Sequence, residues 1–143
     1  MSLNNDKAEK LYNIELTKII KKMGKNTTDN FQLDKVGKQL FGNKYIGTFS
    51  SDNIPTMRQG QYCIVNTDPS NMPGEHWVGL ARMSKKILFY DSFGRTSKSL
   101  MPSLLQTNMN TDLDAEQDIL EKSCGQRCIG LLTIFDKHGW KLI

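Results

Sequence analysis

The chain is organised around residues 116–128, which read EQDILEKSCGQRC. A polar loop leads to a Ser-Cys-Gly turn, and we expect an apolar helix to begin at Cys124 and to end near Phe135. A thiol at a helix N-terminus lies among unpaired N–H groups and at the positive end of the helix dipole, which favours thiolate. Gly125 follows and leaves room for a substrate backbone to approach. The stretch therefore predicts a nucleophile, because thiolate attacks carbonyl carbon.

Gln117 and His76 are the predicted partners of this thiol. Gln117 stands seven residues before Cys124, far enough for the loop to fold back and place its amide beside the sulfur, where an oxyanion needs a donor. His76 begins an apolar run, and a strand beside the helix can supply the general base. Trp77 would then form a wall of the site. His138 is the other histidine, and it falls in a polar helix stop, where capping is the commoner role.

A predicted hairpin brings a carboxylate to His76. The runs 76–81 and 87–91 flank Lys85-Lys86, a pattern that favours an antiparallel pair. Asp91 then lies roughly across from His76 and can accept its imidazole N–H. The chain order His, Asp, Gln, Cys is that of a cysteine protease. Each residue also has a plainer explanation, namely a turn-capping aspartate, a solvated glutamine or a small buried cysteine.

The rest of the pattern predicts one α+β domain over residues 1–143. We expect a small mixed or antiparallel central sheet flanked by helices, with Cys124 at the N-terminus of a buried helix. Further helices are predicted at 7–23, 31–41 and 98–107. A further strand is predicted at 61–66, and 108–118 is predicted to be a surface loop. In the second helix the spacing places Phe31, Val36, Leu40 and Phe41 toward the core.

Composition excludes several classes of protein. A hydrophobic fraction of 38% and a charged fraction of 24% are those of a globular chain, not of a disordered one. We expect no transmembrane helix and no signal peptide, and so a cytosol-like compartment. Three cysteines (Cys63, Cys124 and Cys128) argue against a disulfide framework, and the absence of CxxC or HxxxH pairs argues against a metal site.

The net charge of +4 is concentrated in the first third of the chain. Residues 1–50 hold nine lysines and five acidic residues, whereas residues 51–143 hold ten basic and ten acidic residues. A basic segment can bind nucleic acid through its phosphates. A solvated lysine-rich helix face is the plainer explanation and the one we favour, so only weak DNA binding is expected of residues 1–50.

Together these residues resemble the adenovirus maturation protease family, adenain-like cysteine proteases that are related to SUMO- and ubiquitin-like-specific proteases. CIVNT at 63–67, followed by GEHW at 74–77, looks like the family's strand and histidine segment. LFYDSFG at 88–94 resembles the strand of the acidic triad member, which is Glu in adenovirus enzymes and Asp91 here. YIGTF at 45–49 is similar to the segment that precedes the core sheet. The resemblance covers about residues 33–132, after an N-terminal helical extension (1–30), and suits a compact member from a virophage, a Polinton-like element or another DNA virus.

The resemblance implies a thiol endopeptidase that cleaves viral structural precursors at small or Gly-containing sites during virion maturation. Its catalytic residues would be His76, Asp91, Gln117 and Cys124, with Trp77 and Gly125 contacting substrate. No cofactor or metal is implied for the chemistry. The family's activators, DNA and a disulfide-linked viral peptide, are partners to test, although no cysteine lies between Cys63 and Cys124 to form that link. We expect a monomer in the virion and in the host cytoplasm or nucleus, with no membrane partner.

Two other functions stay open at this point. A deubiquitinase or SUMO-type isopeptidase of the same fold fits HWVGL at 76–80 and YDS at 90–92 about as well, and its substrates also end in Gly-Gly. A non-enzymatic protein that binds DNA or capsid through its basic helices ranks last, because it leaves the His, Asp, Gln and Cys set unexplained.

Overall fold

The described part of the chain forms an α+β fold with a small mixed sheet. The computed structural model describes residues 6–67, 76–84, 86–93, 108–110 and 122–139. Its elements are α1 (Asp6–Met23), α2 (Asn30–Phe41), the 3₁₀ turn η1 (Gly42–Lys44), β1 (Tyr45–Ser50), β2 (Tyr62–Asn66), β3 (Trp77–Arg82), β4 (Ile87–Tyr90), β5 (Asn108–Asn110) and α4 (Cys124–His138). The predicted helices at the start of the chain and at Cys124 are confirmed, and the predicted helix at 98–107 lies outside the described residues.

The sheet has the order β1-β2-β3-β4-β5. The inner pairs β2–β3 and β3–β4 are antiparallel, which confirms the predicted hairpin, and the outer pairs β1–β2 and β4–β5 are parallel. Sequence reasoning missed β1 and wrongly placed residues 108–110 in a loop. Both are edge strands that pair in parallel with their neighbours, so no hairpin turn marks them, and β5 is only three residues long.

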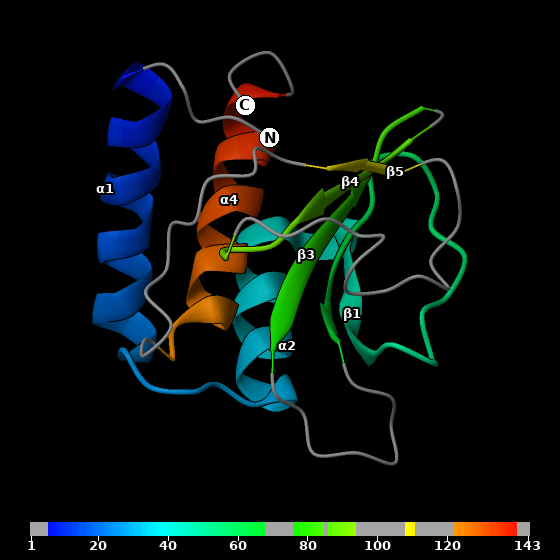
Figure 1. The fold of residues 1–143 in the computed structure, drawn as a ribbon, viewed down its shortest axis with the longest axis horizontal. Helices are drawn as coiled ribbons and strands as arrows, with labels where there is room; N and C mark the ends of the chain where they lie inside the picture. Colours follow the sequence, from blue (N-terminus) through cyan, green and yellow to red (C-terminus); the bar gives the residue numbers. More distant parts are fainter. Residues whose placement is uncertain (1–5, 68–75, 85, 94–107, 111–121, 140–143) are drawn as a thin grey trace.

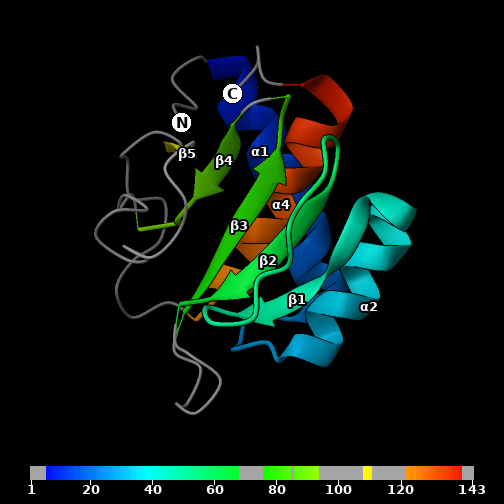
Figure 2. The same cartoon turned by 90° about the vertical axis from the view of Figure 1, so that its right-hand side faces the viewer.

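All the described helices cover one face of the sheet. Figures 1 and 2 show α4 against the central strands, α1 on the far side of α4 and α2 beside α4 near β1. Strand residues alternate accordingly: Ile64 of β2 joins the core under the helices, whereas Cys63 and Val65 join a second cluster on the opposite face. The long α4 is thereby buried between the sheet and α1, which fixes the position of its first residue.

The buried side of α2 differs from the prediction. Val36 and Phe41 are buried as expected, but Phe31 is 78% and Leu40 is 43% exposed. Leu33 and Gly37 take their places on the core side, because a helix presents residues spaced by three and four on one face. A Cβ on Gly37 would lie 2.6 Å from the ring of Tyr45, so the absence of a side chain there lets that ring pack against the helix.

None of the described helices is both long and apolar enough to cross a membrane.

Candidate active site

Cys124 is the first residue of α4. Ser123 is the N-cap residue, but its side chain makes no capping hydrogen bond; its carbonyl accepts the N–H of Arg127 at 2.9 Å. The α4 helix is fifteen residues long, so the thiol lies at the positive end of a substantial macrodipole. The backbone N–H groups of this first turn are those that an α-helix leaves without intrahelical partners. The start of the helix can therefore stabilise negative charge on sulfur or on a nearby oxygen.

His76 and Asp91 are joined at the ends of the central hairpin. His76 directly precedes β3, and its carbonyl accepts the N–H of Thr67 at 2.9 Å. Asp91 directly follows β4, is 1% exposed and is hydrogen-bonded through Oδ1 to Nε2 of His76. The hairpin register pairs Gly79 with Tyr90, and its continuation places Asp91 two residues from the position opposite His76. Such diagonal neighbours are within reach of each other on one side of a hairpin.

This hydrogen bond assigns the two ring nitrogens of His76. Nε2 faces a carboxylate, which only accepts, so Nε2 carries the hydrogen. Nδ1 is then the nitrogen that takes up a proton from Cys124. Burial by itself lowers the pKa of His76, but the hydrogen bonds to Asp91 and Cys124 outweigh it and hold the pKa above its usual value. The imidazolium form is therefore favoured beside the thiol.

The surroundings of Cys124 favour the complementary charge. Burial alone would raise the pKa of this thiol. The side chain of His76 and the backbone N–H groups of Trp77 and Gly125 bond the sulfur, and together they bring the pKa below its usual value. The pKa of the base is raised and the pKa of the thiol is lowered, and both shifts favour proton transfer from Cys124 to His76, toward a thiolate–imidazolium pair.

The other two cysteines lie in contrasting surroundings. Cys63, in β2, is fully buried, and burial raises the pKa of its thiol. Cys128 lies one turn after Cys124, is also fully buried, and has a pKa raised by burial and by the neighbouring charges of Cys124 and Asp91. Its sulfur donates to the carbonyl of Trp77 at 3.5 Å. Both residues are core thiols, and Cys124 is the one of the three whose pKa is lowered.

Two aromatic residues frame the pair. The ring of Phe93 lies 5.0 Å from that of His76 between centroids, a contact that sequence reasoning missed. The hairpin register was the available signal, because its continuation places Phe93 opposite His76. Trp77 bonds the Cys124 sulfur through its backbone N–H, and its indole N–H donates to the carbonyl of Thr28 at 3.1 Å. Trp77 thus contacts the thiol through its backbone and the α1–α2 connection through its half-buried ring.

That connection (residues 24–29) is fixed to the start of α4, which no sequence pattern indicated. The buried side chain of Gln126 donates from Nε2 to the carbonyls of Gly24 and Asn26, each at 2.8 Å. A Cβ on Gly125 would collide with Oγ1 of Thr28. The glycine therefore permits close packing of residues 24–29 against α4, and its predicted contact with substrate stays a prediction. Residues 24–29 form a rim beside the thiol.

Gln117, the predicted oxyanion donor, lies outside the described residues. In the part of the chain that the structure describes, no cluster of three or more His, Cys, Asp or Glu side chains is arranged to hold a metal ion. Of the four predicted catalytic residues, the structure brings Cys124, His76 and Asp91 into direct contact.

Neither a protein-family model nor a curated protein sequence matches this chain.

Proposed function

We propose that this protein is a cysteine endopeptidase that cleaves viral structural precursors at small or Gly-containing sites during virion maturation. The observation that carries the proposal is the hydrogen-bonded series Cys124–His76–Asp91 at the start of α4. The pKa of the thiol is lowered and that of the imidazole is raised, and such opposite shifts support a catalytic role for the series. The viral substrate comes from the resemblance of the motifs to the adenovirus maturation proteases.

The site residues would act in sequence. The Cys124 thiolate attacks the scissile carbonyl carbon, a C–S bond forms, and one electron pair of the carbonyl moves onto its oxygen. His76 gives its proton to the amine as the C–N bond breaks. Water then hydrolyses the thioester, His76 takes a proton from that water, and the thiolate leaves. Asp91 holds the ring and stabilises the imidazolium, as the carboxylate of a triad does.

Two donors are proposed for the oxyanion. The first is the backbone N–H of Cys124, which belongs to the N-terminal turn of α4. The second is the side-chain amide of Gln117, by resemblance. Trp77 and the rim of residues 24–29 are proposed to narrow the approach to the sulfur, which would favour glycine and other small residues at the cleavage site.

Cleavage assays with three fluorogenic substrates test the proposal. The first substrate is a peptide with Gly before the cut and a small apolar residue two positions earlier; the others are ubiquitin and SUMO C-terminal reporters. We expect the wild-type protein to cleave the peptide and the Cys124→Ala variant to lose at least about 10³-fold in kcat, because removal of a nucleophile leaves only binding and oxyanion stabilisation. Cys63→Ala is the matched control and keeps the activity, because Cys63 lies in the sheet away from the site.

The remaining outcomes separate the alternatives. Cleavage of the ubiquitin or SUMO reporter instead of the peptide would replace the substrate class by an isopeptidase, with the same chemistry. If no substrate is cleaved and Cys124 reacts with iodoacetamide no faster than a free cysteine at pH 6, the protease proposal is wrong and a DNA- or capsid-binding function takes its place.

A further inference from the structure

We propose that Tyr12 of α1 is a positioning residue for the site, because its hydroxyl joins the strand that leads to Asp91 and the helix that begins at Cys124. This inference rests on the proposed function and extends it by giving α1 a role in catalysis.

Tyr12 connects α1 to the acidic end of the hairpin. Its hydroxyl lies 2.9 Å from the hydroxyl of Tyr90, and both side chains are almost fully buried, at 2% and 1% exposed. Tyr90 is the last residue of β4 and directly precedes Asp91. A hydrogen bond between two buried hydroxyls fixes the lateral position of a strand end more strictly than apolar contact does. This hydrogen bond therefore ties the position of the Asp91 backbone to that of α1.

The same hydroxyl connects α1 to the nucleophile helix. Nη1 of Arg127 donates to the Tyr12 hydroxyl oxygen at 3.3 Å, and Arg127 lies in the first turn of α4, three residues after Cys124. An arginine side chain only donates, so the Tyr12 oxygen accepts from Arg127 while its own hydrogen remains available to Tyr90. A single hydroxyl thus links three elements that are far apart in sequence.

Close packing of α1 and α4 supports this link. A Cβ on Gly130 would lie 3.7 Å from the Tyr12 ring and 3.9 Å from the Cα of Leu16, so α1 approaches the α4 backbone where α4 has no side chain. Ala8, Tyr12, Leu16 and Ile19 form the buried side of α1. Figure 1 shows α1 running alongside α4, on the side of α4 away from the sheet. Apolar contacts hold α1 against α4. The Tyr12 hydroxyl adds hydrogen bonds, which, unlike apolar contacts, are directional.

The position of Tyr12 allows it to affect proton transfer between Cys124 and His76. The Cys124–His76–Asp91 series spans two elements, since sulfur is carried by α4 whereas the base and the carboxylate are carried by the hairpin. A shift of about 1 Å between α4 and the hairpin would weaken the hydrogen bond between Cys124 and His76, and rates respond to misplacement of this size. Loss of the Tyr12 hydroxyl should therefore weaken the ion pair without removing any of its members.

The Tyr12→Phe variant tests this inference through the reactivity of Cys124. In the wild-type protein, alkylation of Cys124 by iodoacetamide should proceed well below the pH of about 8.5 at which a free cysteine titrates. In Tyr12→Phe we expect the midpoint of the rate–pH profile to move up by about half a pH unit or more. We expect kcat for peptide cleavage to fall about two- to tenfold with little change in KM, because the variant loses the hydrogen bonds of one hydroxyl.

Tyr62→Phe is the matched control. Tyr62 also donates its hydroxyl to a partner on α4, Asp136 at 2.9 Å, but near the C-terminal end of that helix and away from Cys124. It should lower stability to a similar extent and leave the alkylation profile unchanged. Tyr90→Phe should reproduce the part of the Tyr12→Phe effect that comes from their shared hydrogen bond, and the double variant should add little to Tyr12→Phe, because that bond is already lost there.

The outcomes distinguish this inference from the proposed function. An unchanged profile and kcat in Tyr12→Phe, with the wild-type protein reactive at low pH, would overturn the positioning role and leave the protease proposal standing. A wild-type thiol with the reactivity of a free cysteine would overturn both. If Tyr62→Phe moves the midpoint of the alkylation profile equally, Tyr12 contributes only to the stability of the fold and the positioning role is overturned.

Discussion

At the scale of single residues, environment separates three chemically identical thiols. Cys63 and Cys128 are fully buried, and burial raises the pKa of each thiol. Cys124 is also buried, at 7% exposed, yet it is hydrogen-bonded by the imidazole of His76 and by two backbone N–H groups. The difference lies in hydrogen bonding and not in exposure, because burial opposes thiolate at all three positions.

The pH dependence of cleavage follows from the shifted pair. Activity should fall as the pH drops below the lowered pKa of Cys124, since the thiolate is then protonated, and it should fall again as the pH rises above the raised pKa of His76, since the imidazolium is then lost. The Asp91→Asn variant removes a charge that raises the pKa of His76. We expect its alkaline limb in kcat/KM to move down by about one pH unit, equivalent to about 1.4 kcal/mol.

Asp136→Asn is the control for this prediction. Asp136 accepts from Tyr62 and pairs with Lys44 at 2.8 Å, away from the site, so its profile should match that of the wild-type protein. If Asp91→Asn retains the wild-type alkaline limb, Asp91 does not set the pKa of His76.

At the scale of elements, the site depends on a connection that is distant in sequence. Residues 24–29 join α1 to α2, yet they are bonded to Gln126 and Trp77, about 100 and 50 positions away. A capping box between Asp29 and Gln32 fixes the point where this connection enters α2. The rim beside Cys124 is thus held at both ends, by the start of α2 and by the start of α4.

The packing of Gly125 against this rim can be tested by paired substitutions. We expect Gly125→Ala to lower the free energy of unfolding by about 1–3 kcal/mol, because its Cβ would collide with Oγ1 of Thr28 and lie 3.1 Å from Leu33. Thr28→Ala should restore most of that loss in the double variant, because Oγ1 of Thr28 is buried without a hydrogen-bond partner among the described residues. Chemical denaturation measures both effects.

Activity of the double variant separates the two roles of Gly125. A stable and active Gly125→Ala/Thr28→Ala protein would show that the glycine serves packing, whereas a stable but inactive one would support the predicted contact with substrate. Gly79→Ala is the control for a glycine near α4, since its Cβ would meet Cys128 at an ordinary 3.6 Å.

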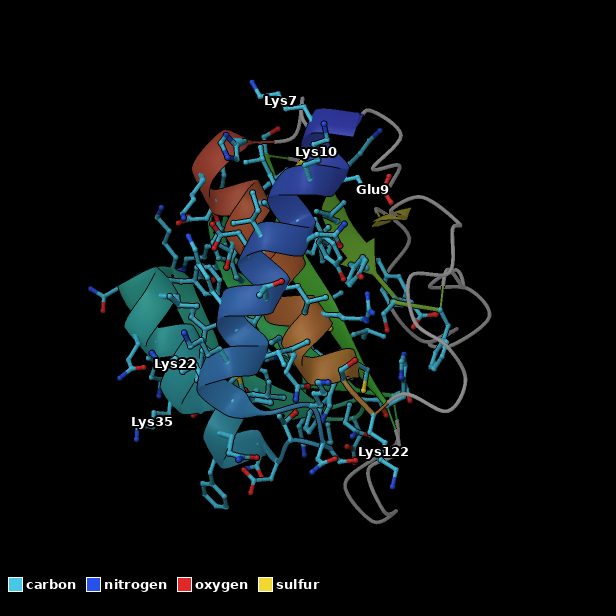
Figure 3. The ribbon with its side chains drawn as sticks, turned by 90° about the vertical axis from the view of Figure 1, so that its left-hand side faces the viewer. Lys7, Glu9, Lys10, Lys22, Lys35 and Lys122 are labelled. Carbon is cyan, nitrogen blue, oxygen red and sulfur yellow. The ribbon has the colours of Figure 1, made fainter. Side chains whose placement is uncertain are left out.

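At the scale of the whole molecule, the positive charge is spread out. Figure 3 shows Lys7 and Lys10 near one end of α1 and Lys22 near the other, with Lys35 on α2. Three further lysines in residues 1–50 are paired with carboxylates, Lys18 with Glu15, Lys38 with Asp34 and Lys44 with Asp136. This distribution suits a solvated surface better than a single phosphate-binding patch.

We therefore expect DNA binding to be weak and non-specific, with a dissociation constant above about 10⁻⁶ M at physiological salt and a slope of log K against log salt no steeper than about −4. Fluorescence anisotropy across a salt series measures both. The double variant Lys22→Gln/Lys35→Gln should weaken DNA binding further. The control variant Glu9→Gln removes a negative charge and should strengthen it. Submicromolar binding with a slope near −8 would contradict this prediction and would support activation by DNA.

The sequence by itself predicted most of the described elements and three residues of the candidate site, Cys124, His76 and Asp91, that the structure brings together. Helical spacing predicted α1 and α4, and the apolar runs around Lys85-Lys86 predicted the hairpin, because these signals come from residues a few positions apart. The same reasoning selected His76 instead of His138 as the base, and it selected Asp91 as the partner of His76. It failed for Phe31 and Leu40, whose exposure depends on which side of α2 meets the sheet.

Only the tertiary structure decided how these residues combine. Contacts of Tyr12 with Tyr90, of Gln126 with residues 24–26 and of Cys124 with His76 join positions far apart in the chain, and no periodicity encodes them. The pKa values of the thiol and the imidazole are likewise properties of packing, because burial and hydrogen-bond partners set them together. A cysteine at a helix start is a common pattern, but the contacts that join this cysteine to His76 and Asp91 form only in the folded chain.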